Sequence, residues 1–175
     1  MSFILKDGNI TLRRLELDDA TALSTLANNF NIWINLRDYF PHPYLLADAE
    51  YFIKKCRSAK PQDTFAITYK DEFVGTIGLM FKNDIYKYTA EVGYWLGEPF
   101  WGKGITTTAL KLLIRHSFED LQLKRLVAFT VEYNKASAKV LEKSGFVKEG
   151  ILRKHSYKNK QFWDEYVFGL VNEDL

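Results

Sequence analysis

A glycine-rich junction between a strand and a helix is the feature that most constrains this fold. Residues 91–96 form a strand-like run, and the segment 98–110 that follows contains Gly102 and Gly104. One apolar stripe then repeats at helical spacing, at Leu110, Leu113, Ile114, Phe118 and Leu121. Glycines at such a junction let the backbone approach a bulky ligand, and the first N–H groups of the helix point outward at its positive end. Because this arrangement binds phosphate, the junction predicts an enzyme that holds the pyrophosphate of a large cofactor.

Three kinds of phosphate loop compete for this segment. A Rossmann fingerprint needs a third small residue where Thr107 stands. A Walker A loop fits at Gly97, Gly102 and Lys103, but Gly104 then supplies no hydroxyl for magnesium. The third kind is a short loop that holds a diphosphate without metal, as in acyl-CoA enzymes. A tight turn that merely opens an ordinary helix is a further interpretation, because short glycine patterns often match by chance.

Size and composition bound the class of protein. The 175 residues predict a single domain spanning 1–175, and 47% hydrophobic with 26% charged residues is typical of a soluble globular protein. A net charge of +2 without a run of Lys or Arg argues against a nucleic-acid partner. The sequence shows no signal-peptide pattern and no apolar span of about 20 residues, so we expect no membrane partner and a cytoplasmic location.

Cysteine and histidine limit the chemistry. Cys56 is the single cysteine and continues the apolar stripe of a predicted helix, so we expect a buried structural thiol and no disulfide. No covalent acyl-enzyme is expected, because Cys56 is the only thiol. His42, His116 and His155 are scattered along the chain without metal-ligand spacing, and we expect no bound metal.

Periodicity and turn residues predict the order β-α-α-β-β-β-α-β-α-β-β. A helix capped by Asp18 carries an apolar face up to Phe30, and a second helix begins near Asp48. The glycine loop opens a long helix, and Gly145 ends a short one. The predicted strands are 10–15, 64–69, 73–82, 89–96, 126–131, 147–155 and 162–171. This order predicts a mixed α/β (α+β) single domain.

Four segments resemble the GNAT superfamily of acetyl-CoA-dependent N-acetyltransferases, in particular its ribosomal-protein N-terminal acetyltransferase branch (RimJ/RimL type). Residues 40–44 are similar to the early substrate-side segment of that branch, and residues 91–96 to its central strand. Residues 101–104 resemble its pyrophosphate loop, and residues 134–146 its N-x-x-S…G-F signature. The resemblance covers nearly the whole chain. It implies the GNAT acyl-CoA N-acyltransferase fold, a mixed central sheet flanked by helices.

Two positions depart from the superfamily pattern. Pro99 stands where the loop often has Gln or Arg, a change that a loop working through backbone N–H groups should tolerate. Leu141 stands where many members carry a tyrosine that protonates the departing thiolate. The resemblance therefore leaves the general acid open.

The resemblance implies that acetyl-CoA is the co-substrate and that backbone groups hold it. The pyrophosphate would lie on the N–H groups of the loop and of the first helical turn, with Lys103 adding charge at the rim. The pantetheine arm would run along a strand edge, and Asn134 would bind it from the other side or cap the following helix. The implied cofactor-binding residues are Tyr94, Trp95, Leu96, Gly102, Lys103, Gly104, Ile105, Thr106, Thr107 and Asn134.

The acceptor amine must lose a proton before it attacks the thioester, and a carboxylate can take that proton. Glu91 in the central strand is the first candidate base, although a strand residue paired with a lysine is an alternative interpretation. Glu98 and His155 are the second and third candidates. Ser137 is the candidate acid by resemblance, with Tyr133 as an alternate; Tyr157 is another. Ser137 could equally be a small residue that permits close helix packing.

Acceptor specificity should come from residues 33–44 and from the closing hairpin. Their aromatic side chains suit a groove for an extended peptide terminus, or they form an edge of the core. The candidate substrate-binding residues are Trp33, Tyr39, Phe40, Tyr157 and Trp163. The expected reaction is direct transfer of acetyl to a primary amine, preferably the α-amine of a protein or peptide. The alternatives are a small amine such as a polyamine or aminoglycoside, or an acyl-CoA-binding domain without catalysis, as a monomer or homodimer.

Overall fold

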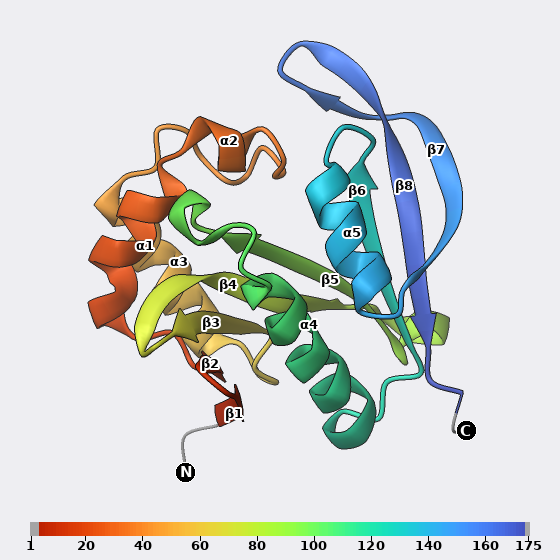
Figure 1. Cartoon of the computed structure of the whole chain (residues 1–175), viewed down its shortest axis with the longest axis horizontal. Coiled ribbons are helices and arrows are strands. Elements are labelled where there is room, and N and C mark those ends of the chain that lie inside the picture. Colours follow the sequence, from red (N-terminus) through yellow and green to blue (C-terminus); the bar gives the residue numbers. More distant parts are fainter. Residues whose placement is uncertain (1–3, 174–175) are drawn as a thin grey trace. The chain divides into compact units, whose positions relative to one another are not determined.

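The computed structural model describes residues 4–173 (Figure 1). These residues form two compact units. The residues up to Gly78 together with Tyr94–Leu112 form the first unit. Leu79–Gly93 and the residues from Leu113 onward form the second. Each unit is described by itself below, and the single domain spanning 1–175 stays a prediction.

The strands form a mixed eight-stranded sheet in the described part of the chain, with the order β1-β2-β3-β4-β5-β6-β8-β7. β5 and β6 pair in parallel, whereas β1–β2, β2–β3, β3–β4, β6–β8 and β7–β8 pair antiparallel. The predicted mixed α/β class is confirmed. In chain order the strands are β1 (Ile4–Asp7), β2 (Ile10–Arg13), β3 (Thr64–Tyr69), β4 (Glu72–Phe81), β5 (Thr89–Leu96), β6 (Arg125–Val131), β7 (Val147–Lys158) and β8 (Gln161–Val171).

The α-helices are α1 (Ala20–Ala27), α2 (Phe30–Trp33), α3 (Leu46–Ser58), α4 (Ile105–Arg115) and α5 (Lys135–Lys143). A wider π-helical turn, His116–Asp120, continues α4, and a 3-10 turn, Glu98–Phe100, precedes the glycine loop. Within residues 4–173, none of the helices has both the length and the apolar character that a membrane crossing requires.

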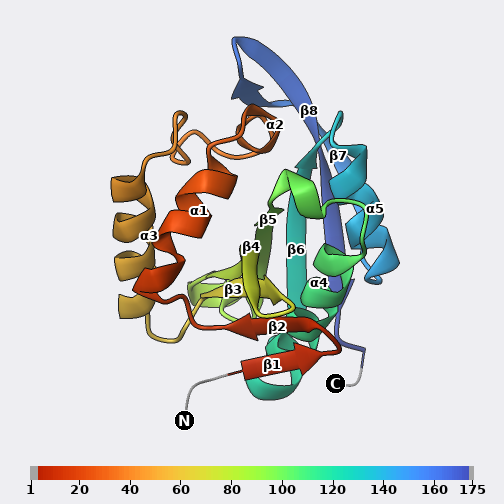
Figure 2. The ribbon, with the colours of Figure 1, turned by 60° about the vertical axis from the view of Figure 1, so that its left-hand side comes forward.

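The core of the first unit lies between helices and strands that are distant in sequence. α1 and α3 lie side by side in both ribbon views (Figures 1 and 2). Their apolar faces pack with side chains of β3, β4 and β5, because every third or fourth helical residue is apolar. The cluster contains Leu15, Ala20, Leu23, Ala27, Ile32, Tyr44, Ala49, Ile53, Cys56, Ala66, Phe73 and Trp95.

The second unit is built around the long β7–β8 hairpin. β8 pairs with β6 along seven positions, from Arg125↔Val171 to Val131↔Glu165, and β7 pairs with the outer side of β8. α5 buries Ala138 and Leu141, and Gly145 at φ +93° ends it in the left-handed conformation that glycine tolerates. Leu141 is therefore a core residue.

The first helical region differs from the prediction at its start and at its end. Asp18 lies inside the 3-10 turn Leu17–Asp19, whose N-cap is Glu16. Asp19 completes the capping box of this turn, since its Oδ2 accepts the Glu16 N–H at 2.8 Å. Asp19 also pairs with Arg13, which fixes it in this role. The predicted cap at Asp18 is wrong: Asp19 is the N-cap position of α1, and its carboxylate binds the Glu16 N–H and Arg13 instead of the N–H groups of that helix. The first helix also ends before Phe30, and Phe30 begins the separate helix α2.

Candidate functional site

The glycine loop adopts the conformation that a phosphate-binding backbone requires. Gly102 and Gly104 have φ values of +73° and +76°, a region that disfavours residues with a Cβ atom. A Cβ placed on either glycine would meet no described atom within 4 Å, so both positions face open space. The loop therefore offers bare backbone on its outer side.

α4 begins directly after the loop and contributes further N–H groups. The Thr108 N–H donates to the Gly104 carbonyl at 3.1 Å and closes the first turn. The N–H groups of Ile105, Thr106 and Thr107 come before this first helical hydrogen bond in the sequence. They lie at the positive end of the helix dipole. Ile105 is buried and anchors the turn, whereas Thr106 and Thr107 are half-buried. The combination is suited to an anion such as a diphosphate.

Two side chains hold the loop in shape from within. The Trp101 indole Nε1 donates to the Leu96 carbonyl at 2.7 Å, which ties the loop to the end of β5. The Lys103 Nζ donates to the Pro99 carbonyl at 2.9 Å and lies 5.4 Å from the Phe100 ring centroid. Lys103 therefore bonds to its own loop in this structure, and Pro99 takes part through its carbonyl group.

At the end of β5, side chains pack into the core, and the backbone groups can serve a ligand. Trp95 is buried, and its ring packs edge-on against Phe40 at 5.9 Å and Phe73 at 6.2 Å. Leu96 is also buried, and Tyr94 is half-buried. The register pairs of β5 with β6 end at Glu91↔Val127, so Tyr94–Leu96 lie beyond the part of β5 that pairs with β6. Trp95 and Leu96 can therefore serve a ligand only through their backbone groups.

Glu91 is buried and forms an ion pair. Its carboxylate Oε2 lies 3.2 Å from the Nζ of Lys82, the residue directly after β4. The Glu91 side chain is 8% exposed and that of Lys82 is 41% exposed. The sequence left two interpretations of Glu91, a catalytic base or a strand residue paired with a lysine. The structure shows a lysine paired with it.

The signature around Asn134 forms a helix cap. The Asn134 Oδ1 accepts the Ser137 N–H at 3.1 Å, at the start of α5. The cap uses only the oxygen of the Asn134 amide. Ser137 is half-buried in the first turn of α5, next to the buried Ala138.

The aromatic residues between positions 30 and 44 differ in burial and in their contacts. Trp33 stacks on His42 with centroids 5.6 Å apart, and Phe30 contacts both rings. Tyr39 is 77% exposed, whereas Phe40 packs against Tyr44 at 4.7 Å and belongs to the edge of the core. Trp33 and Tyr39 are therefore the members of the predicted set that a ligand could reach here.

The closing hairpin presents a second aromatic group. Tyr157 and Phe162 are both more than half exposed, and their rings are 4.9 Å apart. Trp163 is half-buried, its Nε1 donates to the Lys158 carbonyl at 3.3 Å, and its ring meets Tyr133 edge-on at 4.7 Å. Burial, together with the nearby Glu165 charge, raises the pKa of Tyr133, so its hydroxyl stays protonated at neutral pH.

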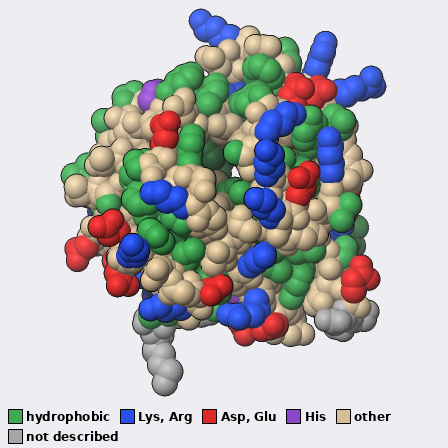
Figure 3. All heavy atoms as spheres, in the orientation of Figure 1, with side chains coloured by type: hydrophobic (Ala, Val, Ile, Leu, Met, Phe, Trp, Pro, Cys, Tyr) green, Lys and Arg blue, Asp and Glu red, His purple; other side chains and the backbone are tan. Residues whose placement is uncertain are grey.

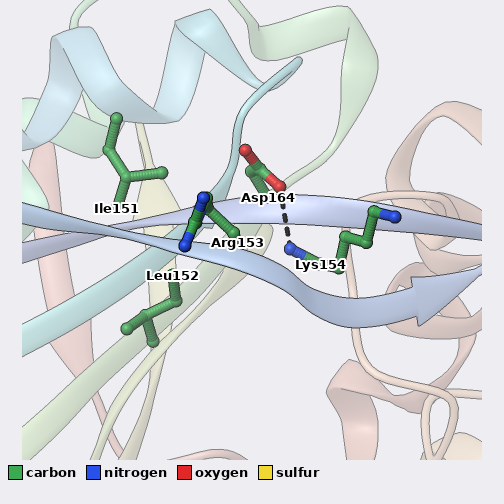
Figure 4. A pocket seen from close by; sticks show the side chains of 5 residues that line it. All are labelled: Ile151, Leu152, Arg153, Lys154 and Asp164. Atoms are coloured by element: carbon green, nitrogen blue, oxygen red, sulfur yellow. Dashed lines mark hydrogen bonds between the residues drawn. The ribbon is translucent and has the colours of Figure 1, made fainter.

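A break in the hairpin register creates a hollow of about 650 Å³ (Figure 4). β7 pairs with β8 at Leu152↔Glu165 and again at Ser156↔Trp163, so three residues of β7 lie opposite Asp164. The Lys154 N–H donates to the Asp164 carboxylate at 2.8 Å and stabilises the bulge. The hollow is lined by Ile151, Leu152, Arg153, Lys154 and Asp164.

The same bulge brings His155 to a carboxylate. The His155 Nδ1 lies 3.0 Å from Glu165 Oε2, and the imidazole stacks over Phe129. A carboxylate on one ring nitrogen fixes the orientation of an imidazole and leaves the other nitrogen available. Glu165 was missing from the predicted site because this pairing depends on the bulge, which the sequence does not reveal.

Residues 9–147 match the family model described as an acetyltransferase (GNAT) domain. This chain belongs to the GNAT family. The Bacillus subtilis (strain 168) protein named probable N-acetyltransferase YjcK is 30% identical over 98% of each chain. The ribosomal-protein-serine acetyltransferase of Escherichia coli (strain K12) is 34% identical over 61% of this chain and 59% of its own. The solved Microcin C7 self-immunity acetyltransferase MccE, in complex with acetyl-CoA and AMP, is 29% identical, with a TM-score of 0.82 over 95% of this chain and 94% of that one.

As a GNAT protein, the chain is an acetyl-CoA-dependent acetyltransferase, and its RimJ/RimL-type resemblance is confirmed. The Cys56 thiol is buried, as predicted, and burial raises its pKa to about 11, so it is a neutral core group at physiological pH. Across residues 4–173, no three His, Cys, Asp or Glu side chains gather in a way that could hold a metal ion.

Proposed function

We propose that this GNAT enzyme transfers acetyl from acetyl-CoA directly to a primary amine, preferably the N-terminal α-amine of a protein or peptide. The observation that carries the proposal is the loop with Gly102 and Gly104 in the left-handed region at the start of α4. Backbone N–H groups from Gly102 to Thr107 would hold the diphosphate. The pantetheine arm would use the backbone of Tyr94–Leu96, and the unused Nδ2 of the Asn134 amide would bind it as well.

Glu91 remains the proposed base. Its carboxylate is buried in the central strand just ahead of Tyr94–Leu96, the segment proposed to receive the pantetheine arm. The Lys82 ammonium lies 3.2 Å from the Glu91 Oε2. His155, oriented by Glu165 through Nδ1, is the second candidate and would accept the proton at Nε2. The two candidates can be separated by mutation.

Glu91→Gln should lower turnover about 100-fold while leaving acetyl-CoA affinity unchanged, because the amide cannot take the proton from the amine. The initial rate of thiol release and the Kd of acetyl-CoA are the measurements. Lys82→Gln is the matched control, since it removes the ion pair and keeps the carboxylate. Unchanged turnover in Glu91→Gln would remove Glu91 as the base, and a loss in His155→Gln would then identify the imidazole.

The departing thiolate would receive a proton or hydrogen bond from Ser137. Its position in the first turn of α5, three residues after the Asn134 cap, supports this assignment. Leu141 is buried and offers no proton. Tyr133, with its raised pKa, keeps its proton at neutral pH and is the alternate donor. Holding the amine and the thioester together contributes several kcal/mol independently of either group.

Charge favours a peptide over a polyamine as acceptor. A polyamine site needs a cluster of carboxylates, but residues 28–45 contain one acidic residue and one basic residue. Residues 147–171 carry five Lys or Arg against three Asp or Glu, and basic side chains project around the hairpin tip at the top of Figure 3. The exposed Tyr39 and Tyr157 and the half-buried Trp33 are suited to the side chains of an extended peptide.

Saturating acetyl-CoA should raise the melting temperature by several degrees, because a ligand that binds only the folded state stabilises it. Thiol release should then be faster with a synthetic peptide bearing a free N-terminus than with its N-acetylated form, or with spermidine or kanamycin. The absence of a melting shift would overturn the proposal. Release with spermidine or kanamycin alone would assign a small-amine enzyme, and binding without release to any amine would assign a non-catalytic domain.

A further inference from the structure

Glu98 joins two segments of the first unit that are distant in sequence. Its carboxylate Oε2 accepts a hydrogen bond from the Asn29 Nδ2 at 2.6 Å. The Asn31 Nδ2 donates to the same carboxylate, at 3.1 Å to Oε1 and 3.3 Å to Oε2. Glu98 opens the 3-10 turn that leads into the glycine loop, and the two asparagines lie at the start of α2. The carboxylate of Glu98 thus links the start of the glycine loop to the start of α2.

The surrounding contacts hold this link in register. The Asn29 Oδ1 accepts the Asn31 N–H at 2.8 Å, so the asparagine that binds Glu98 also caps α2. Leu26 packs against the bare Cα of Gly97, where a Cβ would lie only 2.9 Å from its side chain. Farther along, the Asn28 Oδ1 accepts the Tyr44 N–H at 3.1 Å and closes residues 28–44 into a loop.

Through these hydrogen bonds, ordering of one segment can stabilise the conformation of the other. Hydrogen bonds to a carboxylate are shorter and stronger than neutral ones, and here two amide donors converge on one carboxylate. The linked segments are otherwise short: α2 has four residues and the 3-10 turn has three. Short elements gain little stability from their own hydrogen bonds, so external contacts determine their order.

We propose that Glu98 is a positioning residue that holds residues 28–44, the acceptor side, to the cofactor loop. Acetyl-CoA binding at the loop is thereby coupled to the order of residues 28–44 by a factor of about ten. This inference rests on the proposed function for the identity of the ligand and of the acceptor side. The bridge acts through the two segments and does not require Glu98 to touch either substrate.

Asn29→Asp tests the bridge without removing the cap. The aspartate keeps the Oδ1 that accepts the Asn31 N–H, because Asp and Asn are equally good caps. It replaces the Nδ2 donor by a second carboxylate facing Glu98, which breaks the bridge. Adding Glu98→Gln in the same chain restores the bridge with donor and acceptor exchanged. The introduced glutamine can donate to the introduced aspartate and still accept from Asn31.

Amide hydrogen exchange in residues 28–44, with and without saturating acetyl-CoA, measures the coupling. Acetyl-CoA should slow exchange there about tenfold in the natural protein. Asn29→Asp should lose that protection, and the double variant Asn29→Asp/Glu98→Gln should regain it. Glu72→Gln, an exposed carboxylate at the start of β4, is the matched control and should behave as the natural protein. Asn31→Ala removes the other donor and serves if Asn29→Asp does not fold.

The outcomes separate the bridge from the reaction. Equal protection in the natural protein, Asn29→Asp and Asn31→Ala would overturn the inference and leave the proposed function intact. Protection that is lost in Asn29→Asp but does not return in the double variant would also overturn it, since a general structural effect would explain the loss. Failure of acetyl-CoA to bind the natural protein would overturn the proposed function itself.

Discussion

Gly104→Val is expected to lower acetyl-CoA affinity by about 100-fold or more. Valine is disfavoured at φ +76°, so the backbone must rotate and carry the N–H groups of the loop away from the diphosphate. Two lost hydrogen bonds to a charged group, at about 1.5 kcal/mol or more each, account for this factor. The side chain would also project into the open space beside the loop. Isothermal titration with acetyl-CoA measures the change.

Gly8→Val is the matched control for the backbone cost. Gly8 has φ +55°, and a Cβ there also meets no described atom within 4 Å, but it lies in the turn between β1 and β2. Both variants should lose a similar amount of stability, about 1–2 kcal/mol from the left-handed conformation. Only Gly104→Val should lose acetyl-CoA binding. Normal affinity in Gly104→Val would show that the loop does not hold the diphosphate.

Gly75→Ala is expected to destabilise the first unit by about 3 kcal/mol, the upper range for an overpacked core. A Cβ on Gly75 would lie 2.3 Å from the Trp95 carbonyl oxygen and 3.0 Å from the Leu96 Cα. Both atoms are backbone, so they cannot turn aside as a flexible side chain would. The end of β5 must move, and the loop that follows Leu96 moves with it.

Urea unfolding of Gly75→Ala against Gly150→Ala measures this cost. Gly150 lies in β7, and a Cβ there meets no described atom within 4 Å, so its replacement should change the unfolding midpoint little. Gly75→Ala should also weaken acetyl-CoA binding, since Trp95 and Leu96 are displaced. A midpoint equal to that of the natural protein would contradict this prediction. It would mean that β5 can shift without a loss in the free energy of unfolding.

Local patterns were enough to predict most of the fold. The glycine pair after residues 91–96 identified the loop, and both glycines have a positive φ, a conformation that glycine adopts without strain. Alternation and turn residues located the central strands within a few positions. β1 and α2, each of four residues, were missed. The cytoplasmic location and the oligomeric state stay predictions.

The site was predicted less completely than the fold, because its partners are distant in the chain. Glu91 was singled out, but only the structure shows Lys82 beside it. Glu98 was considered as a base, whereas its carboxylate binds Asn29 and Asn31. The asparagines at 28, 29 and 31 were a visible signal, since this residue type prefers caps and turns. The sequence does not show that two of them face the same carboxylate.

The irregular β7 strand also affects how the protein behaves at high concentration. β7 is the last strand in the sheet order, and its twelve residues would offer a long row of backbone groups to a strand from another molecule. Its register with β8 breaks at Lys148/Gly150 and again at Leu152/Ser156, and Lys148, Arg153 and Lys154 place positive charge along it. Bulges and cationic side chains discourage intermolecular β-pairing. We therefore expect the bulge that shapes the hollow also to hinder aggregation of the protein.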